Sequence, residues 1–294
     1  MKKLQIALTA LLLFNCTTSP GPQTPQSSSS PLAYRVTLPG SPGEITILGS
    51  LHFGTEEMYP LPHSVTQAYD RSGILILETD LAQKADPAVL MARIQLPPGK
   101  TLSSFLDQET LDILNPLLPQ LGLRLQDLEP FQPWYVDLSI SLKLIQQTGL
   151  KPDLGVDQWF FTRYAAAKKD LRPLETMEYQ LSILAPEKIG EQIVSLKETI
   201  KQTQDFKGYL DKLVKAWIRG DDKLLQEEYL NSLEALPELY DRFIIQRNKK
   251  WADKLNLWVG EDQKFFMVVG VAHLVGKDSV LNLLEARGFK LTRL

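Results

Sequence analysis

Short apolar runs bounded by turn residues mark both ends of the folded part of the chain. Residues 34–38 and 44–49 alternate around a Pro-Gly turn, which predicts a β-hairpin. Residues 73–78 contain four consecutive aliphatic side chains, and residues 264–270 are almost wholly apolar, as is typical of buried strands. A last strand is predicted over residues 289–294. The pattern therefore places strands near both chain ends.

Between these strands the periodicity is mostly helical. A short helix over residues 64–71 separates two apolar runs, and this strand, helix, strand order predicts a parallel pair. Pro237 opens a long helix at its favoured first position, and a final helix is expected over residues 279–286. One helical face is formed by apolar residues at spacings of four, three and four, which are Ile189, Ile193, Leu196 and Ile200.

We therefore predict an α/β (α+β) fold. Its central mixed sheet is built from both chain ends and flanked by helices, with a large α-helical insertion over about residues 82–258. Residues 33–294 are predicted to form a single domain.

The N-terminus has the features of an export signal. Lys2 and Lys3 precede an apolar stretch over residues 4–14, which is too short for a resident membrane helix. The stretch ends at Cys16 in a sequence that resembles the lipobox of bacterial lipoproteins, although Asn15 departs from the usual small residue. We predict a lipoprotein signal peptide over residues 1–15, lipidation of Cys16 and a flexible tether over 16–32. The alternative is an ordinary secretion signal with an incidental cysteine.

Composition and charge limit the possible partners. The chain is 44% hydrophobic and 23% charged, which is ordinary for a globular protein. Its formal net charge is −3, and removal of the leader lowers it to about −5. With no dense run of basic residues, nucleic acid is excluded as an expected partner. Cys16 is the only cysteine, so an intramolecular disulfide is excluded. The expected location is the cell envelope, on the periplasmic face or at the cell surface.

Three predicted strands each deliver an ionisable residue at or just after the carboxyl end. These residues are His52, Glu78 and His273. Ligands bind at this edge of open α/β sheets, and a glutamate beside four aliphatic residues needs a partner if it is buried. Two histidines and one carboxylate are the smallest set that holds a transition metal and leaves positions open for water and substrate. Taken singly, each residue is better explained structurally, the two histidines as hydrogen-bonded turn residues and Glu78 as a strand-end cap.

The two histidines share one local frame, which strengthens the pairing. Each lies three residues after a glycine that follows an apolar strand, Gly49 before His52 and Gly270 before His273. Glycine allows the backbone to turn or to approach a neighbour closely there. The third histidine, His63, lies in a proline-rich loop and is expected to be exposed.

On these residues the chain resembles the TraB/PrgY/GumN family, which includes the Tiki proteins, over nearly the whole folded part. The motifs that carry the resemblance are LGSLHFG at 48–54, MYPLP at 58–62, LETDL at 77–81, GVD at 155–157, LET at 174–176 with Gln180, RN at 247–248, and VGVAHLVG at 269–276.

The resemblance implies a Tiki-like metal-dependent hydrolase fold with His52, Glu78 and His273 as its metal and catalytic centre. A Mn, Co or Zn ion held there would activate water against a peptide or a small amide or ester. Glu78 is either a metal ligand or the general base. Arg247 or Asn248 would stabilise an oxyanion or orient the substrate, unless they are polar residues of a helix surface.

Three further residues are given supporting roles. Glu175 and Gln180 are expected to brace a loop against the site, and Asp157 to cap the helix that runs through Tyr164. The competing function is a non-enzymatic lipoprotein that binds a peptide signal or haem, because histidines also ligate haem iron.

Overall fold

The structure is a computed structural model that describes residues 30–83, 86–201, 203–234 and 236–294. The predicted signal peptide, Cys16 and nearly all of the predicted tether lie outside these described residues. Within them, no helix combines the length and the apolar character needed to cross a membrane. Backbone contacts divide the described chain into two compact units. The helical unit comprises residues 83–149 and 177–210, and the sheet unit comprises 30–82, 150–176 and 211–294.

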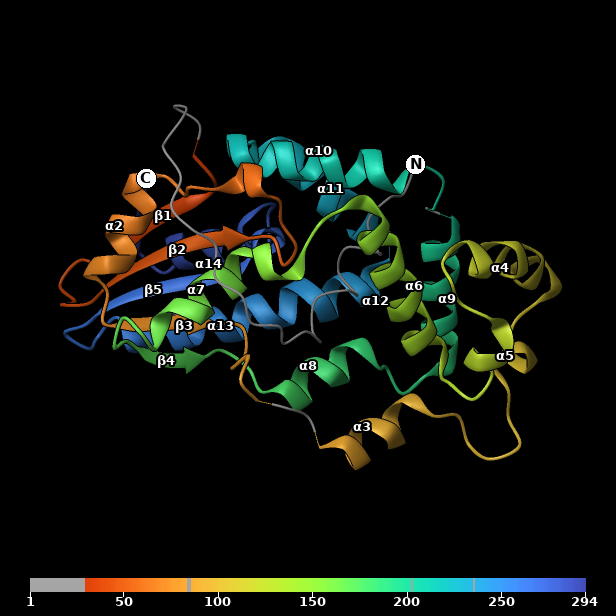
Figure 1. The fold of residues 1–294 in the computed structure, drawn as a ribbon. Coiled ribbons are helices and arrows are strands. Elements are labelled where there is room, and N and C mark those ends of the chain that lie inside the picture. Colours follow the sequence, from red (N-terminus) through yellow and green to blue (C-terminus); the bar gives the residue numbers. More distant parts are fainter. Residues whose placement is uncertain (1–29, 84–85, 202, 235) are drawn as a thin grey trace. The chain divides into compact units, whose positions relative to one another are not determined.

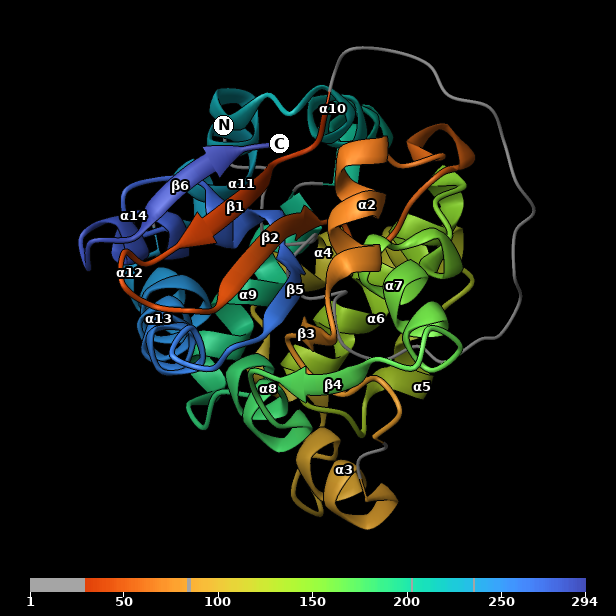
Figure 2. The ribbon, with the colours of Figure 1, turned by 90° about the vertical axis from the view of Figure 1, so that its left-hand side faces the viewer.

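The sheet unit is built on one mixed sheet, whose strands Figure 2 shows side by side. In the described residues the order is β4-β3-β5-β2-β1-β6. The bounds of the strands are β1 Ala33–Thr37, β2 Glu44–Ser50, β3 Ile74–Leu77, β4 Asp170–Pro173, β5 Lys264–Gly270 and β6 Lys290–Arg293. The predicted mixed sheet from both chain ends is confirmed.

Strand pairing confirms the hairpin and corrects one expectation. β1 pairs antiparallel with β2 and with β6, as a hairpin and a closing strand require. β2 and β3 run parallel, but they are not paired, because β5 lies between them and bonds to both. The prediction that β2 and β3 form a directly paired parallel pair is therefore wrong. A strand supplied by a distant segment fills the centre of the sheet.

Strand β4 interrupts the stretch that was expected to be wholly helical. It pairs parallel with β3, with Ile74 opposite Asp170. Its sequence, Asp-Leu-Arg-Pro, is at most half-buried, and it ends on a proline. Both features suit an edge strand, where one face of the backbone needs no partner strand.

Helices surround the sheet and carry its core contacts. Tyr69 of α2, Phe160 of α7 and Phe266 of β5 form one aromatic cluster with ring centroids 4.8 to 5.4 Å apart. The predicted helix from Pro237 is confirmed as a continuous run whose middle turn is a π-helix (Figure 1). The helical elements are η1 Glu56–Met58, α2 His63–Arg71, η3 Pro152–Leu154, α7 Val156–Tyr164, α10 Phe206–Arg219 (from residue 211), α11 Asp222–Glu234, α12 Pro237–Tyr240, η5 Asp241–Ile245, α13 Gln246–Trp258, η6 Val271–Leu274 and α14 Val280–Glu285.

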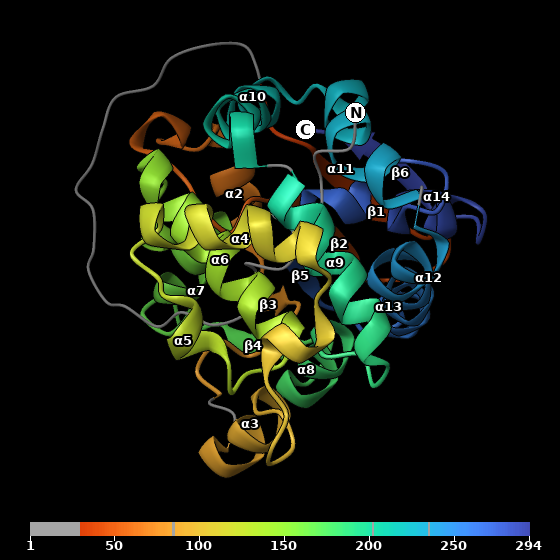
Figure 3. The same cartoon turned by 90° about the vertical axis from the view of Figure 1, so that its right-hand side faces the viewer.

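The helical unit is held by the packing of α6 on α9, with α4 beside α9 (Figure 3). The indole of Trp134 in α6 donates to the carbonyl of Arg93 at 3.1 Å. Asp137, fully buried in α6, accepts a hydrogen bond from the hydroxyl of Ser195 in α9 at 2.5 Å. The elements of this unit are α3 Pro87–Ile94, η2 Leu102–Phe105, α4 Gln108–Gln120, α5 Leu125–Leu128, α6 Pro133–Thr148, α8 Met177–Leu184, α9 Ile189–Lys201 and η4 Thr203–Asp205.

Candidate active site

The carboxyl ends of β2, β3 and β5 meet at one edge of the sheet, and the candidate residues lie there. Because β5 is parallel to both neighbours, Ser50 pairs with Gly270 and Leu77 with Val268. The residues that follow these strands are therefore close in space. A Cβ atom built on Gly270 would lie 3.3 Å from Glu78 Oε1, 3.4 Å from His52 Nε2 and 3.7 Å from His273 Cδ2. The structure brings all three predicted residues together around a glycine that leaves room for them.

His52 is held by a carboxylate on the far side of its ring. Its Nδ1 lies 3.0 Å from Asp157 Oδ2, and its Nε2 is buried with no hydrogen-bond partner among the described residues. Burial lowers the pKa of His52, but the charge and hydrogen bond of Asp157, together with the charge of Glu78, raise it above its ordinary value. His52 thus presents one oriented nitrogen at Gly270, where Glu78 Oε1 also lies.

The predicted helix cap at Asp157 is wrong. Helix α7 begins after Gly155, which makes no side-chain cap, and Asp157 is the second helical residue with its carboxylate on His52. The Gly-Val-Asp motif has a packing reason as well. A Cβ atom on Gly155 would lie 2.4 Å from the carbonyl oxygen of His52, so only glycine lets α7 start this close to the histidine.

Glu78 is buried as a charged carboxylate. Its Oε1 accepts the backbone N–H of Gly270 at 2.8 Å, and its Oε2 accepts from Arg247 Nη2 at 2.5 Å. Burial alone would raise its pKa, but the charges of Arg247, His273 and His52 and the Gly270 hydrogen bond lower the pKa to about 2. Glu78 is therefore ionised over the physiological pH range.

His273 is held as a neutral imidazole of defined tautomer. The amide nitrogen of Asn248 donates to the carbonyl of Asp278 at 2.7 Å, which turns the amide oxygen toward His273 Nδ1 at 2.6 Å. Since that oxygen can only accept, Nδ1 carries the proton and Nε2 is the acceptor. Burial and the charge of Arg247 lower the pKa of His273 to about 3.

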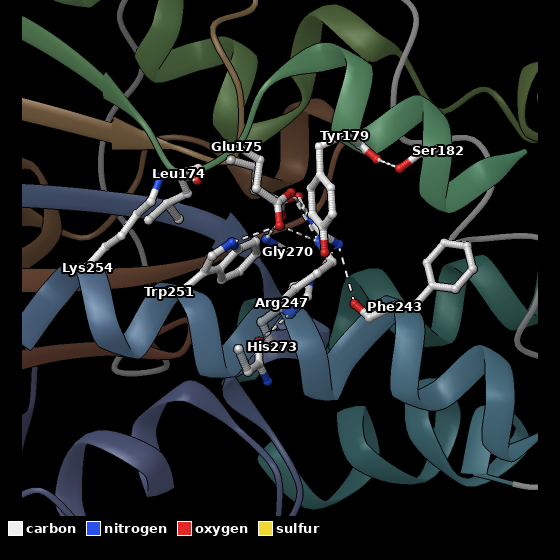
Figure 4. A network of polar contacts seen from close by, with 12 residues as sticks. Leu174, Glu175, Tyr179, Ser182, Phe243, Arg247, Trp251, Lys254, Gly270 and His273 are labelled. Atoms are coloured by element: carbon white, nitrogen blue, oxygen red, sulfur yellow. Dashed lines mark hydrogen bonds and ion pairs between the residues drawn. The ribbon is translucent and has the colours of Figure 1, made fainter. Parts of the chain in front are cut away.

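Arg247 is the centre of the polar network in Figure 4. Its Nη1 lies 3.0 Å from His273 Nε2, and its Nη2 reaches both Glu78 and Glu175. Its Nε contacts both oxygens of Glu175, at 2.9 and 3.1 Å. Burial lowers the pKa of Arg247, but the two glutamates raise it further above its ordinary value. Arg247 and Asn248 are buried and are not helix-surface residues.

Glu175 and Trp251 complete the network, and only the first was expected from the sequence. Glu175 is buried and accepts from the indole of Trp251 at 2.9 Å, while the Trp251 ring lies 4.7 Å from the guanidinium of Arg247. Trp251 follows Arg247 by four residues on α13, a spacing that places both on one helix face and was the available signal. Gln180 lies in the helical unit and is buried, and its bracing role stays a prediction. His63 is exposed at the start of α2, away from this site, as expected.

The donor chemistry of the site fits a divalent transition metal, with one competitor. Both histidines place Nδ1 on a side-chain oxygen, the arrangement that orients metal-ligating histidines, and His52 Nε2 is a buried acceptor or donor without a partner in the described structure. The guanidinium of Arg247, however, is bonded to the other two expected ligands, Glu78 and His273. As the side chains stand, no group of three or more His, Cys, Asp or Glu in the described residues is arranged to hold a metal ion.

Comparison with known proteins gives relatives without an assigned activity. YbaP of Escherichia coli (strain K12), an uncharacterized protein, is 26% identical over 263 residues, which are 86% of this chain and 92% of YbaP. An uncharacterized protein of Treponema pallidum (strain Nichols) is 25% identical over 267 residues, which are 84% of this chain and 79% of that protein. No solved structure matches the chain.

The family comparison covers almost all of the folded chain. The TraB/PrgY/gumN family matches residues 32–293, a range that contains every residue of the candidate active site and all six strands of the described sheet. The resemblance noted from the motifs around His52, Glu78 and His273 is thereby confirmed, and the chain belongs to the TraB/PrgY/gumN family.

Proposed function

We propose that this protein is a metal-dependent hydrolase that acts on peptides or on small amides and esters. The observation that carries the proposal is the convergence of His52, Glu78 and His273 on Gly270, with each side chain oriented by a second group. An ionised carboxylate and two histidines of fixed orientation at a strand edge are suited to activating water. When bound, a Mn, Co or Zn ion would be held by these three residues and would lower the pKa of a water molecule.

The chain's own groups divide into those that face the reacting water and those that orient them. Glu78 is ionised and buried, and a pKa lowered to about 2 makes it a weak proton acceptor, so its role is that of an anionic metal ligand and not of a general base. Asp157 holds the His52 ring through Nδ1, and Asn248 holds His273 in the same way. Both ends of the Asn248 amide are engaged, so we assign Asn248 to orienting His273 and not to contacting substrate.

Hydrolysis of a fluorogenic peptide mixture tests the function. We expect the purified protein supplied with Mn²⁺ or Co²⁺ to cleave peptides, and chelation or His52→Ala to abolish cleavage. His63→Ala is the matched control, because His63 is exposed outside the site. Cleavage that survives His52→Ala would contradict the proposal. A metal-free protein that instead takes up haem with a Soret band would favour the binding function.

We also propose that the protein works in the cell envelope, anchored through lipidated Cys16. The support is the sequence of residues 1–32, with its basic start, apolar stretch and Ser/Pro-rich tether. Labelled fatty acid should enter the wild-type protein and not Cys16→Ala. Equal labelling of both forms, or none in either, would contradict the anchor.

A further inference from the structure

We propose that Arg247 is an internal cation of the active site, which occupies two of the three metal ligands and must release them when a metal binds. The inference rests on the proposed metal-dependent function and concerns how its site is loaded. Its basis is the pair of contacts that the guanidinium makes with Glu78 and His273, two of the three side chains expected to hold the metal. Figure 4 shows the guanidinium beside Glu175 and Trp251.

Each contact of Arg247 with the metal ligands uses an atom that a metal would need. Nη1 takes the lone pair of His273 Nε2, because Nδ1 of that ring already carries its proton toward Asn248. Nη2 takes Oε2 of Glu78 at 2.5 Å. A metal and the guanidinium therefore compete for the same two atoms. His52 Nε2 is the one ligand atom of the three that no donor in the described residues engages.

The metal-free site needs a cation because it contains two buried carboxylates. Glu78 and Glu175 are both buried, and their carboxylates share Nη2 of the one guanidinium. Buried carboxylates are tolerated when they are paired and hydrogen-bonded. Arg247 thus stabilises the metal-free site by pairing with both buried carboxylates.

The same arginine has a second set of contacts that a metal would leave intact. Glu175 accepts from Nε and from Nη2, and the Trp251 ring lies 4.7 Å from the guanidinium. Glu175 is itself fixed by the Trp251 indole at 2.9 Å. The guanidinium fork is able to give up Glu78 and His273 while it stays bonded to Glu175. Release then needs only a local shift of the Arg247 head group.

An internal competitor also selects among metals. To bind, a metal ion must gain more free energy from two imidazoles and a carboxylate than the site loses when Arg247 gives up its contacts with Glu78 and His273. Transition metals bind imidazole nitrogen strongly, whereas Mg²⁺ and Ca²⁺ prefer oxygen ligands. We therefore expect the wild-type site to take Zn²⁺, Co²⁺ or Mn²⁺ and to exclude Mg²⁺ and Ca²⁺.

Zinc titration of metal-stripped protein by calorimetry tests the competition. We expect Arg247→Met to bind Zn²⁺ roughly tenfold or more tightly than the wild type, because the cation that competes for Glu78 and His273 is gone. The same variant should unfold at a lower temperature without metal and recover on adding Zn²⁺. The matched control is Arg172→Met, which removes an arginine bonded to Glu261 outside the site and should leave zinc affinity unchanged.

The results of the zinc titration distinguish failure of the Arg247 competition from failure of the proposed metal-dependent function. Equal or weaker zinc binding by Arg247→Met, with binding by the wild type, overturns the competition alone. Absence of zinc binding in both forms overturns the metal site and the competition together. If the variant does not fold, the test is made on the wild type, by recording the NMR signal of the buried Arg247 Nε–H with and without zinc. Zinc should move this signal and leave it protected by Glu175, whereas an unmoved signal on zinc binding overturns the competition.

Discussion

At the scale of single residues, the close approach of Gly155 to His52 constrains the site. The helix that delivers Asp157 starts so close to the histidine that any side chain on Gly155 would meet the His52 carbonyl oxygen at 2.4 Å. The ion pair between His52 and Asp157 depends on that approach. A backbone contact, and not a side chain alone, therefore sets the orientation of the proposed metal ligand.

Substitution of this glycine gives a prediction about stability and metal binding. Gly155→Ala should destabilise the protein by about 1 to 3 kcal/mol, because helix α7 must move away from His52. Metal affinity should fall with it. The control is Gly190→Ala in α9, where an added Cβ meets nothing within 4 Å and should leave stability unchanged or slightly raised. Chemical denaturation measures the stability of the two variants. Equal loss of stability in Gly155→Ala and Gly190→Ala would contradict the packing argument.

Residue patterns in the sequence identified the ligand candidates but not the network that holds them. His52, Glu78 and His273 were predictable because each follows an apolar run at a strand end. The bonds from Arg247 to Glu175 and Glu78 join segments up to 169 residues apart. No local periodicity records such pairings, so neither the burial of Arg247 nor the role of Asp157 followed from sequence pattern.

At the scale of elements, α6 and α9 are joined by a buried acid that should make stability depend on pH. Burial raises the pKa of Asp137 to about 6, although hydroxyls of Ser195, Thr199 and Ser141 oppose the shift. The folded state therefore binds the proton more tightly than the unfolded state. Stability from this group is full at low pH and is lost as the pH rises from about 4 to about 6.

Asp137→Asn removes this titration. At each pH the free energy of unfolding of the variant is compared with that of the wild type. This difference should shift in favour of the variant by about 2 to 3 kcal/mol between pH 4 and pH 8. Urea denaturation of both forms at the two pH values measures the difference, with the exposed Asp112→Asn as control. A difference that does not change with pH would show that Asp137 keeps an ordinary pKa when folded.

Elements with a clear period were predictable, and those set by distant partners were not. The hairpin of β1 and β2, the strand β5 and the helix α9 match their expected ranges closely. Strand β4 was not predicted because its four residues, which include Arg172 and Pro173, contain no apolar run of the kind that indicates a strand. The insertion of β5 between β2 and β3 depends on a segment almost 190 residues after β3, which local pattern does not encode.

At the scale of the whole molecule, the residues assigned to the candidate site share one compact unit, the sheet unit. All of the residues assigned to the site, from His52 to His273, lie in that unit, although three separate stretches of chain supply them. Two segments of the predicted insertion, residues 83–149 and 177–210, form a compact unit with its own buried contacts, whereas residues 150–176 and 211–258 belong to the sheet unit. The family match spans both units.

The central claim is that His52, Glu78 and His273 form a metal centre, and the metal content of the protein tests it most directly. Elemental analysis would compare the wild type, purified without chelator and loaded with Mn²⁺, Co²⁺ or Zn²⁺, with His52→Ala, His273→Ala and the control His63→Ala. We predict about one transition metal ion per chain in the wild type and the control, lost in the two site variants. A wild type that remains metal-free after loading, or site variants that keep the metal, would contradict the claim.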